Sequence, residues 1–256
     1  MTIKDLRKLS LIDFPPHKTC VVATAGCNFR CQFCQEPELV LTPEKLPTIE
    51  NDVFYDFLRK NKPWLDAVCI TGGEPTINQD LPEHMAHIKA LGYLIKLETN
   101  GTNPDMIEKL IDQKLVDYIA MDVKTTLEKY ETIVRVPVNQ ADLKRTTALL
   151  IASCVAYEFR MTVVPTLIEE QDFHVIGQWL CGAEHFYLQQ FSNKKCLKRA
   201  LQSLGQFPYA TVEKFRDILQ QYIKHVEICS APACIIPAEQ NSSTAEQKGA
   251  VEAKIG

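Results

Sequence analysis

Apolar residues along the chain fall into seven short runs, separated by longer stretches in which they recur at helical spacing. Two of the runs, residues 20–23 and 116–123, are almost continuously apolar, which indicates strands buried on both faces, as in a parallel sheet. The pattern predicts strands at residues 19–26, 67–71, 94–99, 116–123, 157–165, 185–191 and 226–229.

Between these strands, apolar residues recur at the spacing of an α-helix. The pattern predicts helices at residues 49–60, 82–91, 104–114, 143–153, 172–180 and 212–223. Thr48 is a candidate N-cap of the first, Gly92 stands where a helix ends, and Pro104 follows Asn103 at a helix start. Alternating strands and helices predict an α/β fold of right-handed βα units. Periodicity alone leaves open whether they form a full barrel, a partial barrel or a doubly wound sheet.

Composition and charge narrow the class of protein. The chain has 256 residues, of which 46% are hydrophobic and 23% charged, and its net charge of −4 gives no reason to expect nucleic acid or a membrane as partner. No run of 18 apolar residues occurs and residues 1–10 are charged, so we expect a cytoplasmic protein. Residues 1–236 are expected to form the folded domain, and residues 237–256 a disordered polar tail. The basic residues at 194–199 are expected to form a solvated loop.

Three cysteines stand close together directly after the first predicted strand. Cys27, Cys31 and Cys34 have the spacing C-x3-C-x2-C. A loop this short brings three thiolates together around an iron–sulfur cluster and leaves one iron without a protein ligand. Structural zinc usually takes four ligands in two close pairs, and Cys229 with Cys234 is a poor second pair. The spacing therefore favours a cluster over zinc.

Polar motifs follow three later strands. Gly72-Gly73-Glu74 ends the second strand, Glu98-Thr99-Asn100 the third, and Asp122 with Lys124 the fourth. The carboxyl ends of parallel strands meet at one edge of a sheet or barrel, where sites are built, so these residues are candidates for one site. The alternatives are a tight glycine turn and strand ends that turn into solvent.

Together these motifs resemble the radical S-adenosylmethionine (SAM) superfamily. The resemblance implies a partial (β/α)6 TIM-like barrel with a [4Fe–4S] cluster at its carboxyl-terminal edge, held by Cys27, Cys31 and Cys34. It further implies that the methionine part of SAM binds the open iron, that Phe33 packs against the adenine, and that Gly72, Gly73 and Glu74 contact the amino group.

Within that superfamily the chain resembles the activases of glycyl radical enzymes. These carry D-T-N-G and D-x-K where this chain has Glu98-Thr99-Asn100-Gly101 and Asp122-Val123-Lys124, so Glu98 replaces an aspartate. The resemblance implies that Glu98, Thr99 and Asn100 bind SAM and that Asp122 and Lys124 lie beside SAM and substrate. Residues 9–15, 162–165 and 187–191 bring the chain nearest to activating proteins of anaerobic (class III) ribonucleotide reductase. The resemblance spans residues 5–229, with Pro16 and Gln35 where relatives carry glycine and histidine.

The function that this resemblance implies is activation of a partner enzyme. A reduced cluster would cleave SAM to a 5′-deoxyadenosyl radical, which would take hydrogen from a glycine of an anaerobic ribonucleotide reductase. A flavodoxin or ferredoxin-type protein would supply the electron. Two alternatives stay open: a radical SAM enzyme that acts on a small molecule, RNA or a different glycyl radical enzyme, and a non-enzymatic electron-transfer or zinc protein.

The remaining cysteines and histidines are expected to be structural. Cys20, Cys69 and Cys154 lie in or beside apolar segments and are expected to pack in the core. The other four cysteines, Cys181, Cys196, Cys229 and Cys234, form no close pairs that would predict a second cluster. His84 and His87 are expected to face solvent.

Overall fold

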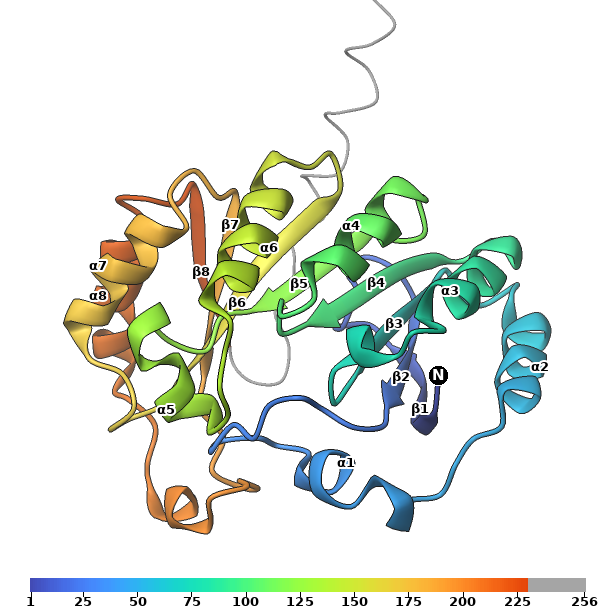
Figure 1. Cartoon of the computed structure of the whole chain (residues 1–256), viewed down its shortest axis with the longest axis horizontal. Helices are drawn as coiled ribbons and strands as arrows, with labels where there is room; N and C mark the ends of the chain where they lie inside the picture. Colours follow the sequence, from blue (N-terminus) through green and yellow to red (C-terminus); the bar gives the residue numbers. More distant parts are fainter. Residues whose placement is uncertain (230–256) are drawn as a thin grey trace, which may run out of the picture.

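The computed structural model of the chain describes residues 1–229, which form one eight-stranded sheet whose strand order follows the chain (Figure 1). The strands are β1 (Ile3–Ser10), β2 (Thr19–Thr24), β3 (Ala67–Gly72), β4 (Leu94–Thr99), β5 (Tyr118–Asp122), β6 (Ala156–Val163), β7 (His185–Gln190) and β8 (His225–Cys229). Strand β1 pairs antiparallel with β2, and β2 to β8 are parallel neighbours. All seven predicted strands are confirmed.

Eight helices connect the strands in the described part of the chain. They are α1 (Pro37–Leu41), α2 (Asn51–Asn61), α3 (Leu81–Ala90), α4 (Pro104–Asp112), α5 (Tyr130–Val134), α6 (Gln140–Ala152), α7 (Glu170–Trp179) and α8 (Tyr209–Leu219). The six predicted helices correspond to α2, α3, α4, α6, α7 and α8, shifted by a few residues at their ends. The side chain of Asn103 accepts a hydrogen bond from the amide of Met106, which confirms the predicted start of α4.

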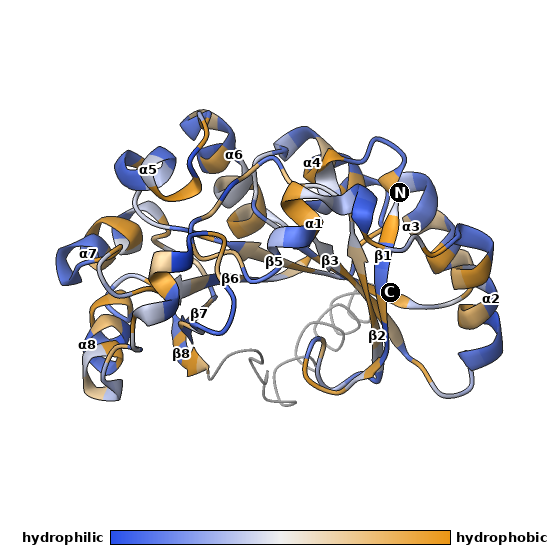
Figure 2. Cartoon of the chain, turned by 90° about the horizontal axis from the view of Figure 1, so that it is seen from below, coloured by the Kyte–Doolittle hydropathy of each residue, from blue (hydrophilic) through white to orange (hydrophobic). Residues whose placement is uncertain are grey.

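The sheet is a partial barrel. Within residues 1–229 the two end strands, β1 and β8, do not pair with each other, so the barrel is not closed. The helices cover one face of the curved sheet (Figure 2). The main hydrophobic core lies between the sheet and these helices and contains Val22, Ile70, Leu97, Met121 and Phe159, all nearly or fully buried. Six helical crossovers between seven parallel strands confirm the predicted (β/α)6 architecture and exclude a doubly wound sheet.

Strand β1 was not predicted from the sequence. Only its two end residues are buried, and most of its exposed residues are charged, namely Asp5, Arg7 and Lys8. An edge strand needs few apolar residues, and charges on it discourage pairing with other chains. Ile3 and Leu6 supply the apolar side, because they pack into the main core.

Three local predictions were wrong. The residue that precedes α2 is Glu50 and not Thr48, whose hydroxyl instead accepts a hydrogen bond from Nζ of Lys4 (2.8 Å). Cys154 is exposed because it lies in the turn between α6 and β6. His84 is partly buried and hydrogen-bonds the hydroxyl of Tyr55.

Other local predictions were confirmed. Cys20 and Cys69 are fully buried, and His87 is exposed with its ring stacked on Tyr55 (3.9 Å between centroids). Cys234 and the predicted tail lie outside the described residues. None of the helices in residues 1–229 has the length and apolar character needed to cross a membrane.

Candidate active site

The loop that carries the three cysteines lies against the Gly72-Gly73-Glu74 turn. The amide of Glu74 donates a hydrogen bond to the carbonyl of Gly26 (2.8 Å), which directly precedes Cys27. A Cβ atom on Gly73 would lie 1.7 Å from that carbonyl oxygen, so only glycine allows this contact. The sequence predicted that the glycines let the backbone approach a ligand. In the structure, Gly73 lets two strand-end loops of this chain touch.

Helix α5 holds the cysteine loop from another side. The amides of Arg30 and Gln32 donate hydrogen bonds to the carbonyls of Val134 (2.8 Å) and Ile133 (3.3 Å). Carbonyls in the last turn of a helix have no partner within the helix and need one elsewhere. The cysteine loop supplies that partner, so the short helix α5, which the sequence did not predict, positions the loop.

The three thiols fit a multi-iron cluster better than a single metal ion. Burial is the largest cause that raises the pKa of Cys27 to about 12 and that of Cys31 to about 11, and each thiol also feels the next one along the loop. Across residues 1–229, no three His, Cys, Asp or Glu side chains gather tightly enough to hold one metal ion. Three thiols on one loop agree in number with the protein ligands that a [4Fe–4S] cluster with one open iron takes.

The buried carboxylate of Glu74 connects two strand ends of the site. Its carboxylate accepts hydrogen bonds from the amide and hydroxyl of Thr76 (3.1 and 2.6 Å), the hydroxyl of Thr99 (2.7 Å) and the amide of Asn100 (2.6 Å). Burial is the main cause that raises the pKa of this carboxyl group, and the four hydrogen bonds oppose it. Glu74 therefore ties the end of β3 to the end of β4.

Asn100 ties β4 to the cysteine loop. Its side-chain amide donates to the side-chain oxygen of Asn28 (2.8 Å), and its own oxygen accepts from the hydroxyl of Thr102 (2.7 Å). That hydroxyl in turn accepts from the side-chain amide of Asn28 (2.7 Å). Asn28 lies between Cys27 and Cys31, so this ring of three side chains orients the loop.

A network of charged side chains lines the inner face of the sheet. Arg160 on β6 donates to Glu98 on β4 (2.6 Å) and to Asp122 on β5 (3.1 Å), and Asp122 accepts a second ion pair from Lys124 (3.1 Å). Thr71 on β3 donates to the other oxygen of Glu98 (2.8 Å). Four neighbouring strands thus contribute side chains to one polar layer.

The network keeps both carboxylates ionised. Burial alone would raise the pKa of Glu98, but the nearby Arg160 and Lys96 outweigh it and lower that pKa to about 2. Burial likewise opposes ionisation of Asp122, yet Lys124 and Arg160 lower the pKa of that group. The pKa of Lys124 is raised despite burial, chiefly because Asp122 lies beside it.

A second polar layer lies deeper in the partial barrel. Lys96 on β4 forms an ion pair with Glu158 on β6 (3.1 Å), and both side chains are almost fully buried. The hydroxyl of Tyr118 on β5 donates to the other oxygen of Glu158 (2.8 Å). Every oxygen of Glu158 therefore has a partner, as a buried charge requires.

The loop between β7 and α8, residues 191–208, covers the cysteine loop. Gln35 donates its side-chain amide to the carbonyls of Ser192 (2.9 Å) and Phe33 (3.1 Å). Lys195 forms ion pairs with Glu38 (2.6 Å) and Glu36 (3.5 Å). These ion pairs lie at the surface, since the side chain of Lys195 is 42% exposed, so they agree with the prediction of a solvated basic loop. The exposed Lys194, Lys198 and Arg199 do face solvent.

Phe33 packs in an apolar cluster at the edge of this site. The cluster consists of Phe33, Ile133, Val164, Phe191, Cys196 and Leu201. Nζ of Lys124 lies 6.0 Å from the centre of the Phe33 ring, so the aromatic side chain borders the charged layer. Cys196 is buried here, whereas Cys181 is exposed.

The structure thus brings the predicted site residues together at the carboxyl edge of the sheet. Sequence reasoning missed Arg160, Glu158 and Asn28. The signal for the first two was present, because two charged residues at alternate positions of an otherwise apolar strand point to one polar face. Asn28 gave no signal beyond its place in the loop.

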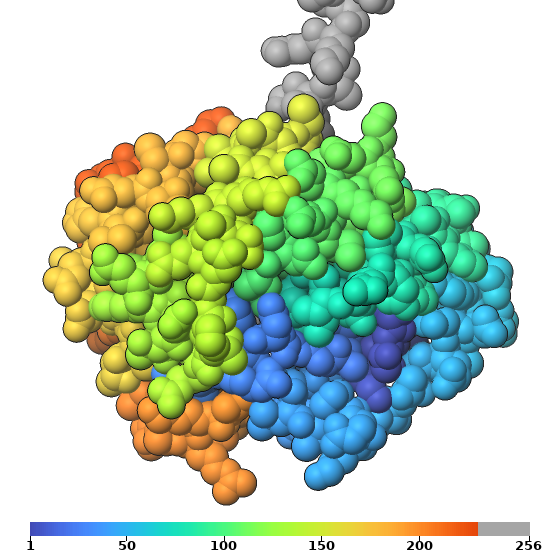
Figure 3. Space-filling view, in the orientation of Figure 1, coloured from blue at the N-terminus to red at the C-terminus, as the bar shows by residue number. Residues whose placement is uncertain are grey.

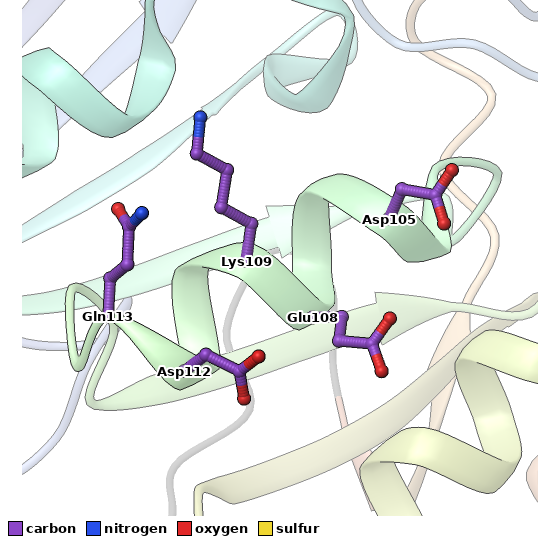
Figure 4. Close-up of a pocket in the computed structure, with 5 residues that line it drawn as sticks. All are labelled: Asp105, Glu108, Lys109, Asp112 and Gln113. Atoms are coloured by element: carbon purple, nitrogen blue, oxygen red, sulfur yellow. The ribbon is translucent and has the colours of Figure 1, made fainter.

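The hollow with a volume of about 290 Å³ on α4 belongs to another surface (Figure 4). Its lining residues are Asp105, Glu108, Lys109, Asp112 and Gln113. All five come from α4 and the residue after it, and Arg145 forms ion pairs with Asp105 and Glu108. None of the motif residues lines this hollow.

A partial barrel that gathers three thiols, a glycine turn and a charged inner layer at its carboxyl edge is the fold and site of a radical SAM enzyme. The family model described as the radical SAM superfamily matches residues 21–175, and the chain belongs to that superfamily. Its members use a [4Fe–4S] cluster and SAM.

Individual relatives agree with this assignment. A protein of Methanocaldococcus jannaschii, provisionally named a glycyl-radical enzyme activating enzyme, is 32% identical over 86% of this chain and 92% of its own. The pyruvate formate-lyase-activating enzyme of Listeria monocytogenes is 32% identical over 41% of this chain and 46% of its own. The structure of SuiB from Streptococcus suis bound to SAM covers 82% of this chain and 51% of its own, with a TM-score of 0.60 at 14% identity, and shows the shared fold.

Proposed function

We propose that this protein activates a glycyl radical enzyme, and that its target is an anaerobic ribonucleotide reductase. The observation that carries the first part is the match to the M. jannaschii relative, which spans nearly the whole of both chains. The choice of target rests on the resemblance of residues 9–15, 162–165 and 187–191 to the ribonucleotide reductase branch. The sheet also supports a macromolecular substrate, because β1 and β8 do not pair within residues 1–229 and the barrel is not closed.

In this proposal Cys27, Cys31 and Cys34 hold the cluster. When bound, the cluster would supply the electron that cleaves SAM. This cleavage would provide the driving force for removing a hydrogen atom from an unactivated carbon. The chain's contribution is to position the ligands and to keep water out. Glu74 and Asn100 serve this purpose through their hydrogen bonds to neighbouring loops.

The charged inner layer suits the methionine part of SAM, which carries an ammonium and a carboxylate group. Asp122 and Glu98 offer negative charge, Lys124 and Arg160 offer positive charge, and all four are held in fixed positions by one another. Phe33 borders this charged layer, with Nζ of Lys124 6.0 Å from its ring centre, and is the residue that we place beside the adenine. We propose that these residues contact SAM directly.

The side chains of Glu74 and Thr99 are engaged within the protein. Glu74 accepts four hydrogen bonds, and the hydroxyl of Thr99 both donates to Glu74 and accepts from the amide of Gly101 (3.1 Å). We therefore propose that Gly72, Gly73, Glu74, Thr99 and Asn100 meet SAM through backbone groups. Their side chains hold that backbone in place.

The test is reconstitution of the cluster without oxygen, followed by reduction and addition of SAM and the anaerobic ribonucleotide reductase. Electron paramagnetic resonance should show a glycyl radical on the reductase. The Cys31→Ala variant should lose the signal, and Cys154→Ala, which changes an exposed cysteine outside the loop, should keep it. Steady formation of 5′-deoxyadenosine without a glycyl radical would refute the proposed target and point to a small molecule, RNA or another glycyl radical enzyme.

A further inference from the structure

We infer that the hydroxyl group of Tyr130 donates a hydrogen bond to a sulfur atom of the cluster beside Cys31, and that this bond raises the reduction potential of the cluster. Tyr130 is the first residue of α5 and is fully buried. The inference rests on the part of the proposed function in which three cysteines hold the cluster. It adds a residue that tunes the cluster without being one of its ligands.

The hydroxyl of Tyr130 lies at the carboxyl end of β5, where the site is built. It accepts a hydrogen bond from the backbone amide of Lys124 (3.2 Å). The side chain of Lys124 forms the ion pair with Asp122 in the charged inner layer (3.1 Å). The hydroxyl therefore borders the residues that we propose to contact SAM.

Tyr130 also lies beside the segment of the cysteine loop around Cys31. The ring centroids of Tyr130 and Phe29 are 6.0 Å apart, and Phe29 is two residues before Cys31. The amides of Arg30 and Gln32, which flank Cys31, donate to carbonyls in the last turn of α5. On the molecular surface the light-green segment that contains α5 adjoins the blue segment that contains the cysteine loop (Figure 3). Helix α5 therefore packs directly against this part of the loop.

The hydroxyl of Tyr130 has a proton to donate and, within residues 1–229, no acceptor for it. Its one hydrogen bond uses the oxygen as acceptor. Burial is the main cause that raises the pKa of this hydroxyl; Lys124 opposes the rise, and the nearby Cys31 and Asp122 add to it. The group therefore keeps its proton at neutral pH. A buried donor normally has an acceptor, so a sulfur atom beside Cys31 would complete its hydrogen bonding.

A hydrogen bond to a sulfur atom changes the reduction potential of an iron–sulfur cluster. The reduced cluster carries one more negative charge than the oxidised cluster, and its sulfur atoms share that charge. A donated proton therefore stabilises the reduced form more than the oxidised form. The hydroxyl of Tyr130 should make the cluster easier to reduce before SAM is cleaved.

The experiment measures the midpoint potential of the assembled cluster without SAM, by redox titration followed by electron paramagnetic resonance. The test variant is Tyr130→Phe. The matched control is Tyr157→Phe, because the buried hydroxyl of Tyr157 also accepts one backbone amide, that of Glu184 (3.1 Å), but lies near the start of β6. At a fixed ambient potential, the ratio of reduced to oxidised cluster should fall about tenfold in Tyr130→Phe, a shift of about 59 mV for one electron. The control should change this ratio less than about twofold.

A second substitution separates the hydrogen bond from a purely structural role of the ring. 3-Fluorotyrosine at position 130 keeps the hydroxyl, and the fluorine makes its proton a stronger donor. The midpoint potential should then rise, which loosened packing around the cysteine loop would not produce. If Tyr130→Phe assembles no cluster, the rise with 3-fluorotyrosine still tests the inference. Pulsed electron paramagnetic resonance in D2O should also show one exchangeable proton fewer near the reduced cluster in Tyr130→Phe.

Equal potentials for the parent and Tyr130→Phe, or equal shifts in Tyr130→Phe and Tyr157→Phe, would overturn the inference. So would weaker SAM binding in Tyr130→Phe with an unchanged potential, because the hydroxyl would then serve SAM and not the cluster. The iron content of the parent tests the proposed ligands, and the potentials of the variants test the hydrogen bond. None of these measurements needs a glycyl radical, so failure of the proposed function would be seen separately.

Discussion

The guanidinium of Arg160 lies 2.6 Å from the carboxylate of Glu98, although the two residues are 62 positions apart in the chain. Strand β5 separates their strands in the sheet, and its Asp122 accepts from the same guanidinium. One arginine therefore fixes the geometry of two carboxylates that we propose to contact SAM.

Replacement of Arg160 by methionine should destabilise the fold strongly. It would leave Glu98 and Asp122 without their shared cation, and loss of one partner of a buried ion pair typically costs about 3–5 kcal/mol. Urea unfolding measures this change. Arg145→Met removes two ion pairs at the exposed surface of α4 and should cost less than about 1 kcal/mol. If Arg160→Met and Arg145→Met lowered the free energy of unfolding by similar amounts, the charged inner layer would not have the stabilising role described here.

A lower pH should decrease the stability of the fold, partly through protonation of Glu98. Its pKa is lowered in the folded state to about 2, from an ordinary value of 4.5, so its contribution is fully present above pH 4.5 and is lost as the pH falls toward 2. As the pH falls from 6 to 3, the contribution of Glu98 to the free energy of unfolding should decrease by about 2 kcal/mol. The measurement compares urea unfolding of the parent and Glu98→Gln at both pH values. A difference between them that stays constant with pH would show that Glu98 does not titrate as described.

Replacement of Gly73 by alanine should prevent cluster assembly. Its Cβ atom would overlap the carbonyl of Gly26 and push the cysteine loop away from β3. Gly205→Ala is the matched control, since a Cβ atom there has no neighbour within 4 Å. Iron and sulfide per chain after reconstitution give the readout. A Gly73→Ala protein with a full cluster would mean that the loop does not depend on this contact.

Cys196 should not be a cluster ligand, although it is buried beside Phe33. It belongs to the apolar cluster, and in the proposed function the protein ligands of the cluster are the three thiols of the cysteine loop. Cys196→Ala should therefore retain its iron and keep an iron that binds SAM, whereas Cys34→Ala should lose the cluster. A loss of iron in Cys196→Ala equal to that in Cys34→Ala would make Cys196 part of the site.

Much of the fold could be predicted because buried parallel strands and amphipathic helices leave strong local patterns. Strands β2 to β8 and the six longer helices were found in this way. Strand β1 was not predicted, because this edge strand has only Ile3 and Leu6 on its apolar side. Helix α5 was not predicted, because it has only five residues and its last carbonyls accept hydrogen bonds from the cysteine loop.

The sequence by itself determined the chemistry of the site, since the spacing of Cys27, Cys31 and Cys34 and the motifs after β3, β4 and β5 need only local order to be recognised. The tertiary structure decided how these parts are held. Arg160 meets Glu98, Glu74 meets Asn100 and Lys198 meets Gln32 only because the curved sheet brings the ends of its strands to one edge. Contacts between residues so far apart in the chain leave no periodic signal, because their distance is set by the packing of the whole sheet.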